Sequence, residues 1–331
     1  MLPFPSLAFL VSFVIINHNK YIIKDKESPL LVILFLRGAI LIMKSKLTHY
    51  IILFFAVFFL STSAIFVKLA QAPSSITAFY RLLFSAIVLL PFLLFHKENR
   101  RQFLKLTKKQ WLFGILSGLL LSTHYVLWFE SLNYTSVASS TVLVTLQPLF
   151  SFVGGYFLFQ ERYPKKALFG CLIALIGCVV IGWGDFQLSM TAFVGDIMAF
   201  IAAGIIASYF MVGQHIRSSL SVIPYSFLGY GSSAFFLAMY SLITHAPFTG
   251  YSISTWKAFL GIALISTILG QMIFNWLLKW LSASVISMSI LGEAVGTCIL
   301  SYFILHETLN LQQLLGIFII LLGLAIFLKN S

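Results

Sequence analysis

Charged residues are scarce in this chain of 331 amino acids. Asp, Glu, Lys and Arg together make up 9% of the sequence, whereas hydrophobic residues make up 60%. An ordinary soluble domain carries about 25% charged residues, so the composition excludes that class. The net charge of +12 would suggest a nucleic-acid partner in a soluble protein. Here the basic residues lie between apolar segments, and no nucleic acid is expected.

Cysteine is also scarce, and the motifs of several enzyme classes are missing. The three cysteines all lie within apolar segments, which argues against a disulfide framework and a thiolate metal site. The segment HETLN (306–310) begins like a zinc-binding helix but lacks the second histidine. No glycine-flanked nucleophilic serine and no phosphate-binding loop is present in the sequence. We therefore expect neither an enzyme nor a metal or cofactor.

The chain has instead ten apolar segments between Leu47 and Leu328. A helix of about twenty apolar residues crosses a bilayer, and only helices or closed barrels satisfy their backbone hydrogen bonds there. The sequence therefore predicts an all-α polytopic membrane protein with ten transmembrane helices. We place them at 48–70, 76–95, 111–131, 137–159, 166–183, 193–213, 222–244, 257–278, 282–305 and 311–328.

The basic residues predict how these spans are oriented. Fourteen of them lie on one side, against three near the other, namely Lys68, Arg81 and Lys257. Loops rich in Lys and Arg stay in the cytoplasm. Both ends of the ten-span unit should therefore be cytoplasmic, and the protein should be integral to the plasma membrane, the inner membrane of a bacterium. The fourteen residues are Lys44, Lys46, Lys97, Arg100, Arg101, Lys105, Lys108, Lys109, Arg162, Lys165, Lys166, Arg217, Lys279 and Lys329.

Residues 1–42 do not fit the pattern of the spans. Their apolar stretches are short or interrupted by Arg37, whereas Met43 directly precedes KSK and the first good span. We expect 1–42 to be an N-terminal extension outside the functional unit, the alternative being a further membrane-lying segment. The functional unit then consists of a first five-helix repeat at 43–185 and a second at 190–331.

The repeat is visible in the sequence itself. When the chain is shifted by 146 residues, TSVASSTVLVTLQPLFSFVGGYFLFQE (135–161) aligns with LSASVISMSILGEAVGTCILSYFILHE (281–307) without gaps. Further on, Gly170 and Gly177 align with Gly316 and Gly323. Because each copy holds an odd number of spans, the second copy is inverted relative to the first. Two inverted five-helix repeats are typical of secondary transporters.

The repeated sequence resembles the drug/metabolite transporter superfamily, specifically its EamA-type members. The resemblance covers about residues 47–328 and rests on VKLAQAPSSITAFYRLLFSAIVLLP (67–91), WFESLNYTSVASS (128–140), LQPLF (146–150) and LGEAVG (291–296). It implies a carrier of small organic metabolites, often an exporter, that works by alternating access. This chain has Ala294 where the family usually has a proline, which leaves open whether the ninth helix bends at Glu293.

Glu293 is the strongest candidate for a functional residue. An ionisable side chain near the middle of a bilayer is costly, and a carboxyl group there can exchange a proton with substrate or water. Ser289 and Thr297 lie on the same helix face, and Gln147 is the repeat partner of Glu293. We expect these four residues to contact substrate in a central cavity and Glu293 to couple transport to protons. The alternative is a glutamate held by neighbouring hydroxyls for helix packing alone.

The eighth and third spans offer further polar stripes. Thr267, Gln271, Asn275 and Lys279 recur every four residues, and His124 and Trp128 are similarly spaced. Gln271, Asn275, His124 and Trp128 are candidates to bind a zwitterionic or polyhydroxyl solute. The alternative, interhelical hydrogen bonds worth about 0.6 kcal/mol each, stays open.

Three other glutamates and one arginine lie near span ends. Arg81 would contact either an anionic substrate group or the outer lipid headgroups, and Glu130 would reach the outer surface. Glu161 and Glu307 each end the fourth helix of a repeat, where a structural role at the helix junction is favoured.

Together these features predict a secondary transporter for a small polar organic metabolite. A neutral or zwitterionic solute, amino-acid-like, is favoured because one glutamate and several amides line the spans. The alternative is a channel or an accessory membrane subunit. The expected partners are the metabolite and the lipid bilayer, with a homodimer left open.

Overall fold

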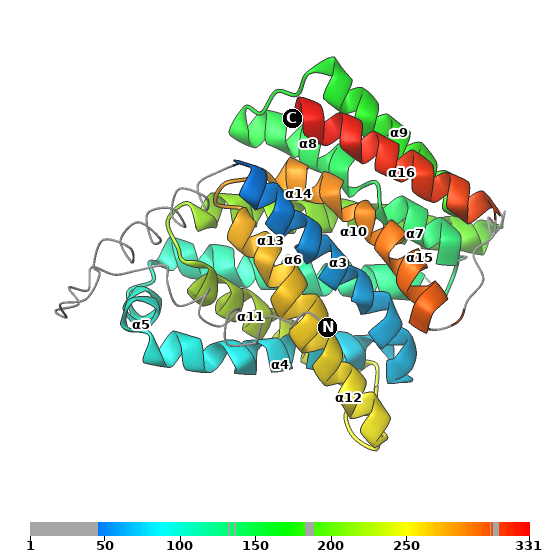
Figure 1. Cartoon of the computed structure of the whole chain (residues 1–331). Helices are drawn as coiled ribbons and strands as arrows, with labels where there is room; N and C mark the ends of the chain where they lie inside the picture. The colour runs from blue at the N-terminus through cyan, green and yellow to red at the C-terminus, as the bar shows by residue number, and fades with distance from the viewer. Residues whose placement is uncertain (1–45, 132, 136, 183–188, 305, 307–310) are drawn as a thin grey trace, which may run out of the picture. The chain divides into compact units, whose positions relative to one another are not determined.

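The computed structural model describes residues 46–331 except 132, 136, 183–188, 305 and 307–310 (Figure 1). The predicted extension 1–42 lies outside the described residues. Residues His49–Ser331 form one compact unit.

The first half of the chain folds into helices that match the first five predicted spans. They are α3 (Lys46–Ala70), α4 (Ser74–Phe95), α6 (Lys108–Ser131), the pair α7 (Val137–Val144) and α8 (Gln147–Phe159), and α9 (Lys165–Gly182); the short α5 (Lys97–Leu104) lies between α4 and α6.

The second half repeats this order. It contains α10 (Met190–Arg217), α11 (Val222–Ile243), the continuous run α12 (Ile253–Gly261), η2 (Ile262–Gln271) and α13 (Met272–Leu277), the pair α14 (Ala283–Ile290) and α15 (Gly292–Ile304), and α16 (Leu311–Asn330). The ten predicted spans are thus confirmed as helical segments. Nine of the helical stretches in the described residues are long and apolar enough to cross a membrane, and α9 is the tenth predicted span.

Two of the spans are broken at equivalent places. In the first half, Pro148 would clash with the carbonyl of residue 144 in a continuous helix, and α7 ends at Val144. In the second half, α14 ends at Ile290 and α15 begins at Gly292. The break near Glu293 is therefore present even though Ala294 replaces the usual proline.

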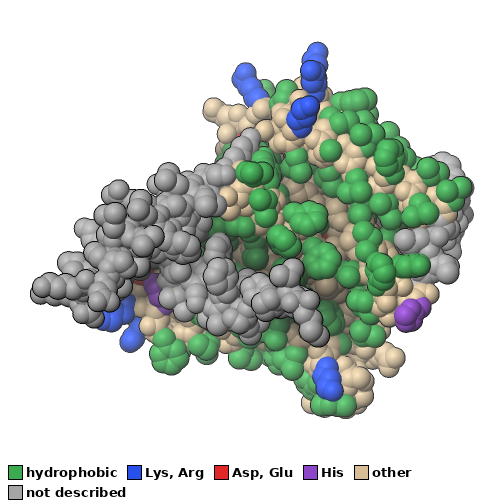
Figure 2. All heavy atoms as spheres, in the orientation of Figure 1, with side chains coloured by type: hydrophobic (Ala, Val, Ile, Leu, Met, Phe, Trp, Pro, Cys, Tyr) green, Lys and Arg blue, Asp and Glu red, His purple; other side chains and the backbone are tan. Residues whose placement is uncertain are grey.

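Large apolar side chains cover the outside of the helices. Figure 2 shows one face on which hydrophobic side chains fill the middle and basic side chains lie at the margins. Phe54, Phe157, Phe169 and Phe318, from four different helices, are each more than half exposed. Such a surface is costly in water and favourable in lipid, so the chain is an integral multi-pass membrane protein.

The last helices of the two halves, α9 and α16, lie side by side (Figure 1) and pack through the repeated glycines. A Cβ on Gly170 would lie 2.8 Å from the carbonyl oxygen of Gly323, and a Cβ on Gly177 would lie 2.9 Å from that of Gly316. The glycines pair in reverse order, so the two helices run antiparallel, as expected for inverted repeats. Without side chains at these positions the backbones approach closely.

The repeat is also visible in local geometry. Gln160 and His306, which are 146 residues apart, both have a left-handed backbone, with φ of 57° and 55°. Tyr156 with Phe157, and Tyr302 with Phe303, form the same edge-to-face pair, with ring centres 5.2 Å apart in each.

The first helix of the second half, α10, contacts helices of both halves. They include α6, α7, α8, α11, α13 and α14. Small side chains allow this close packing. The fully buried alanines on α10 are Ala199, Ala202, Ala203 and Ala207.

Candidate functional site

Arg81 of α4 brings a positive charge into the interior of the helix bundle. Its side chain is 4% exposed; Nε donates to Oγ1 of Thr267 at 2.8 Å and Nη1 donates to Oγ of Ser63 at 3.0 Å. Its Cζ lies 5.2 Å from the centre of the Tyr125 ring, a cation–π contact. Nη2 is buried and has no acceptor in the described part of the chain. The guanidinium therefore faces inward and does not reach outer headgroups, one of the two alternatives for Arg81.

The helical segment that Arg81 contacts, η2, has an unusual geometry. Thr267 lies in η2, a π-helical segment in which its Oγ1 donates to the carbonyl of Ile262, five residues earlier, at 3.0 Å. A second side chain of α4, Ser85, donates to the carbonyl of Ala263 at 3.3 Å. Side chains of α4 therefore share in the hydrogen bonding of η2, and this fixes Arg81 against it. π-helical turns are rare and frequently occur at functional sites.

Glu293 lies in the first turn of α15, immediately after the helix break. A carboxylate is favourable there because the helix N-terminus carries partial positive charge. The side chain is half-buried and makes no hydrogen bond or ion pair with any residue that the structure describes. It is close enough to Arg81 and Tyr125 to interact with them electrostatically. Arg81 and Glu293 thus face a common region from α4 and α15 without forming an ion pair.

His124 and Trp128 stack on each other, one turn apart on α6. Their ring centres are 5.9 Å apart and the rings are inclined by 24°. Nδ1 of His124 lies 3.0 Å from the carbonyl oxygen of Ala202 on α10, so Nδ1 carries the proton in this contact. Nε1 of Trp128 is buried without an acceptor among the described residues. His124 is therefore bonded to a neighbouring helix, and the Trp128 N–H remains available.

Asn275 and Gln271 lie one turn apart in the eighth span. As with His124 and Trp128, one side chain is hydrogen-bonded to neighbouring helices and the other has an N–H group without an acceptor among the described residues. Asn275 is fully buried; its Oδ1 accepts from the Tyr209 hydroxyl at 2.9 Å, and its Nδ2 donates to Ser226 and Tyr230, each at 3.3 Å. This is the interhelical arrangement that the sequence offered as the alternative to substrate binding. Gln271 is 5% exposed, and its Nε2, near the Tyr209 hydroxyl, makes no hydrogen bond within the described ranges.

The remaining candidates bond to protein backbone. Nε2 of Gln147 donates to the carbonyl of Ser287 at 3.4 Å, Ser289 donates to its own helix at 2.9 Å, and Thr297 donates to the carbonyl of Ser61 at 3.1 Å. Among the predicted site residues, Arg81, Trp128 and Gln271 have buried N–H groups without a protein partner in the described structure, and the Glu293 carboxylate makes no hydrogen bond there.

Glu130, predicted to reach the outer surface, lies at the end of α6 and is hydrogen-bonded to α11. It is half-buried; Oε1 accepts from the Tyr240 hydroxyl at 2.6 Å and Oε2 accepts from Nδ2 of Asn133 at 3.1 Å. The end of α6 is thereby tied to the end of α11.

A polar cluster that the sequence did not predict joins α8, α10 and α14. Oε1 of Glu161 accepts from Nε2 of Gln214 at 2.8 Å, and Oε2 accepts from the Ser284 hydroxyl at 2.8 Å and the Tyr163 hydroxyl at 3.2 Å. The Tyr163 hydroxyl also lies 2.6 Å from Oγ of Ser282, the residue that caps α14. We refer to Glu161, Tyr163, Gln214, Ser282 and Ser284 as the Glu161 latch.

Backbone contacts fix the orientation of the latch. Oε1 of Gln214 accepts from the amide of Ala283 at 2.6 Å, which directs its NH2 group toward Glu161. Burial raises the pKa of Tyr163 to about 12, with the Ser282 hydrogen bond lowering it and the Glu161 charge raising it, so its hydroxyl stays protonated at neutral pH. The latch gives Glu161 the junction role that the sequence favoured; the equivalent Glu307 lies outside the described residues.

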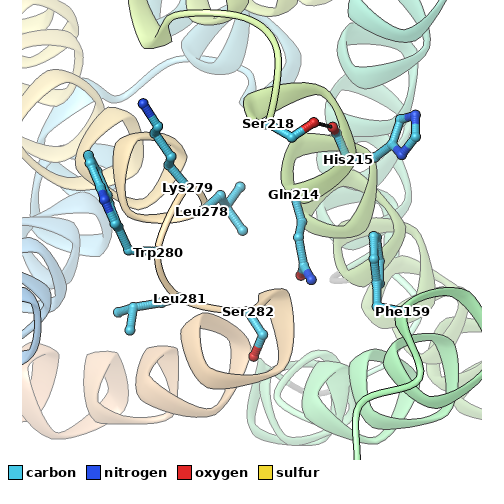
Figure 3. A pocket seen from close by; sticks show the side chains of 9 residues that line it. All are labelled: Phe159, Gln214, His215, Ser218, Leu278, Lys279, Trp280, Leu281 and Ser282. Carbon is cyan, nitrogen blue, oxygen red and sulfur yellow. Dashed lines mark hydrogen bonds between the residues drawn. The ribbon is translucent and has the colours of Figure 1, made fainter. Parts of the chain in front are cut away.

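A cavity of about 440 Å³ adjoins the latch. Figure 3 shows Gln214 of α10 and Phe159 at the end of α8 on one side of the cavity, across from Leu278 and Lys279. The rest of the wall is formed by His215, Ser218, Leu278, Lys279, Trp280 and Leu281. The cavity and the latch lie at the N-terminal end of α14, whereas Glu293 follows its C-terminal end.

The two ends of the broken spans are packed unequally. Ser151 of α8 and Ser287 of α14 lie 2.7 Å apart through their hydroxyls, and Ser284 donates to the carbonyl of Ser151 at 3.0 Å. Every residue of α14 from Ala283 to Ser289 is buried, but only Val295 is buried in α15. The half of the broken span next to the latch, α14, is therefore more deeply buried than α15.

No group of three or more His, Cys, Asp or Glu side chains suited to a metal ion lies within the described residues. His306 of the HETLN segment is exposed, and residues 307–310 lie outside those residues.

Comparison with known proteins identifies the relatives of this chain. The model of the EamA-like transporter family matches twice, at residues 47–183 and 193–329. The uncharacterized transporter YyaM of Bacillus subtilis (strain 168) is 26% identical over 260 residues, which is 76% of this chain and 83% of the relative. An S-adenosylmethionine uptake transporter of Rickettsia conorii (strain Malish 7) is 28% identical over 251 residues, covering 74% and 79%. A crystal structure of a protein that is 19% identical superimposes with a TM-score of 0.72 over 86% of this chain and 98% of that one, which shows the same fold.

Proposed function

Since the chain belongs to the EamA-like transporter family, we propose that it is a secondary carrier which moves a small polar organic metabolite across the membrane. The observation that carries this proposal is that Arg81 and Glu293 interact electrostatically without an ion pair, while unbonded N–H groups of Trp128 and Gln271 lie on the helical segments that contact Arg81. Polar groups left without partners at the depth of a bilayer are costly unless a ligand bonds to them. A purely structural bundle has no use for them.

The proposed mechanism is alternating access between the two inverted halves. The helix breaks support it, because a break occurs at the equivalent place in both halves, and because α14 is buried along its length whereas α15 is not. In this proposal the Glu161 latch closes the cytoplasmic mouth and opens when the other mouth closes. The basic side chains beside the latch favour a cytoplasmic position, with both ends of the ten-span unit cytoplasmic and the protein in the inner membrane of a bacterium.

The proposed substrate is neutral or zwitterionic, and amino-acid-like solutes are favoured. The site pairs one positive with one negative side chain, so a solute with a large net charge would leave one of them uncompensated. The S-adenosylmethionine transporter of Rickettsia carries a solute that contains an amino-acid group. We propose export as the direction, as the family resemblance implies.

The test is reconstitution of the full chain in vesicles, with a panel of amino acids, S-adenosylmethionine, nucleosides, sugars, amines and organic acids. Thermal stabilisation identifies the solutes that bind, and labelled solute then measures flux. A carrier should show saturable exchange that is accelerated by substrate on the opposite side. Flux that rises linearly with concentration would favour the channel alternative, and no binding or flux at all would favour an accessory subunit.

Proton coupling through Glu293 is part of the proposal. A pH gradient should drive wild-type uptake into vesicles, whereas Glu293→Gln should retain exchange and lose the response to the gradient. Glu130→Gln is the matched control, because Glu130 is also half-buried but bonds to Tyr240 and Asn133. An unchanged response in Glu293→Gln would remove the proton role from this residue.

A further inference from the structure

Arg81 is a buried cation whose charge the described protein does not compensate by contact. No described carboxylate lies within ion-pair distance of it, and Nη2 is buried without an acceptor. A guanidinium carries five N–H donors and no acceptor, and hydroxyls of Thr267 and Ser63 satisfy only two of its nitrogens. Burying such a group without an anion is strongly unfavourable. An oxygen anion is the complement that this position lacks.

Two further unbonded donors lie on the helical segments that contact Arg81. Tyr125, which contacts Arg81 through its ring, is three residues before Trp128 on α6, so the two occupy one face of that helix. Thr267, which fixes Arg81, is four residues before Gln271 in the eighth span. The N–H groups of Trp128 and Gln271, which have no acceptor among the described residues, therefore lie within one helical turn of residues that contact Arg81. A ligand that meets donors alone must be rich in acceptors, as a carboxylate or phosphate is.

The negative charge of Glu293 favours a carboxylate over a phosphate as the anion that binds Arg81. Glu293 interacts with the charge of Arg81 but does not touch it. A doubly charged phosphate would be repelled by this carboxylate. An amino acid offers a carboxylate to Arg81 and an ammonium group to Glu293, and so compensates both charges at once.

We propose that Arg81 is the substrate-carboxylate anchor of this carrier, with Nη2 donating to the carboxylate and Glu293 accepting from the ammonium group of the same α-amino acid. The Tyr125 and Trp128 rings then lie beside the bound solute. This inference rests on the proposed function and adds to it the residue that recognises the anionic end.

The test compares ligand pairs that differ only at the carboxylate. The twenty standard amino acids are screened singly by thermal stabilisation of the purified full chain, and each one that binds is compared with its methyl ester. In the wild type the ester should bind at least about tenfold more weakly, the loss expected for a charge-assisted hydrogen bond. In Arg81→Gln the free acid should weaken by a similar factor, while the affinity for the ester stays unchanged.

A second variant separates recognition from folding. Arg81→Lys keeps the charge and should retain part of the preference for acid over ester. N-acetylation of the amino acid should weaken binding to the wild type but not to Glu293→Gln. If Arg81 only supports the fold, its substitution should weaken acid and ester equally, and that result would overturn the proposal.

Other results distinguish this inference from the proposed function. Saturable binding of a sugar or nucleoside, with no amino acid bound, would leave the carrier function in place and refute the carboxylate anchor. Saturable binding of inorganic phosphate that Arg81→Gln abolishes, again with no amino acid bound, would assign the anchor to a phosphate and refute the amino-acid substrate. If nothing on the wider panel binds or moves, both proposals fail.

Discussion

Removing the carboxylate of Glu161 should open the latch end of the protein. Glu161 accepts three hydrogen bonds, but two of the donors keep another acceptor in Glu161→Ala: Ser284 has the carbonyl of Ser151 at 3.0 Å, and Tyr163 has Oγ of Ser282 at 2.6 Å. Gln214 has no such alternative, because its Oε1 is held by the amide of Ala283. The loss is therefore chiefly one donor left without its charged acceptor.

An unsatisfied buried donor costs about 1–3 kcal/mol. Because Glu161 is half-buried and a cavity adjoins the latch, water can partly replace the lost bond, and the lower part of this range, about 1–2 kcal/mol, applies. This cost falls on the closed state and not on the open one. The ratio of open to closed protein should then rise about 5- to 30-fold.

Cysteine accessibility measures this ratio. Ser287 is fully buried behind the latch, so Ser287→Cys, with the three native cysteines replaced by alanine, should react with a membrane-impermeant maleimide only when the latch opens. Adding Glu161→Ala should raise the labelling rate by the same 5- to 30-fold factor. Glu130→Ala is the matched control, since it removes a similarly bonded glutamate at the end of α6. An unchanged rate, or an equal rise in the control, would refute the role of the latch.

Three other perturbations test the packing. Gly177→Ala should lower the free energy of unfolding by about 1–3 kcal/mol, because its Cβ would lie 2.7 Å from the backbone nitrogen of Ile320, whereas Gly231→Ala meets nothing within 4 Å and should leave the melting temperature unchanged or raised. Asn275→Ala should destabilise the protein by about 1–3 kcal/mol without weakening ligand affinity; the reverse result would restore Asn275 as a substrate contact. The pKa of Tyr163, raised by burial to about 12, exceeds its unfolded value of about 10, so its stabilising effect is complete below about pH 10 and is lost as the pH rises through 12. The wild-type melting temperature should fall more steeply than that of Tyr163→Phe over this interval, and parallel curves would contradict the assignment.

Hydropathy was sufficient to predict the helices because every segment that crosses a bilayer must be apolar and must satisfy its own backbone hydrogen bonds. The fourth and ninth predicted spans, 137–159 and 282–305, correspond to α7 with α8 and to α14 with α15. The repeat also displayed glycines seven residues apart in both copies, although the packing of α9 against α16 through them became apparent only in the structure. These features depend on composition and local spacing, which a sequence displays directly.

The rotation of each helix is not a local property, and there the sequence was less informative. Arg81 lies near a span end, where a long side chain can turn outward to headgroups or inward to its neighbours. It turns inward because η2 and α3 present hydroxyls to it, and those contacts depend on packing between distant segments. The same limit applies to Asn275, whose spacing fits a cavity wall and a helix interface equally well.

The latch was missed for a related reason. Its members come from the end of α8, the linker before α9, the last turns of α10 and the start of α14, and no short motif connects them. The signal that was available is the position of Glu161 at the end of a repeat unit. A polar residue at that position can form hydrogen bonds with residues of the other repeat.

The two repeats differ in sequence at the positions that form the latch. If both mouths were built alike, each latch contact would have an equivalent 146 residues away. The equivalent of Ser284 is Ala138, and the equivalent of Ser287 is Thr141, so the hydroxyl that donates to Glu161 has no counterpart at the other end. Because the two mouths have different hydrogen-bonding groups, their closed states differ in free energy even though the helices are related by symmetry. In the proposed alternating-access cycle, these contacts would favour closure at the latch, and a bound solute would supply the free energy that shifts the protein to the alternative arrangement.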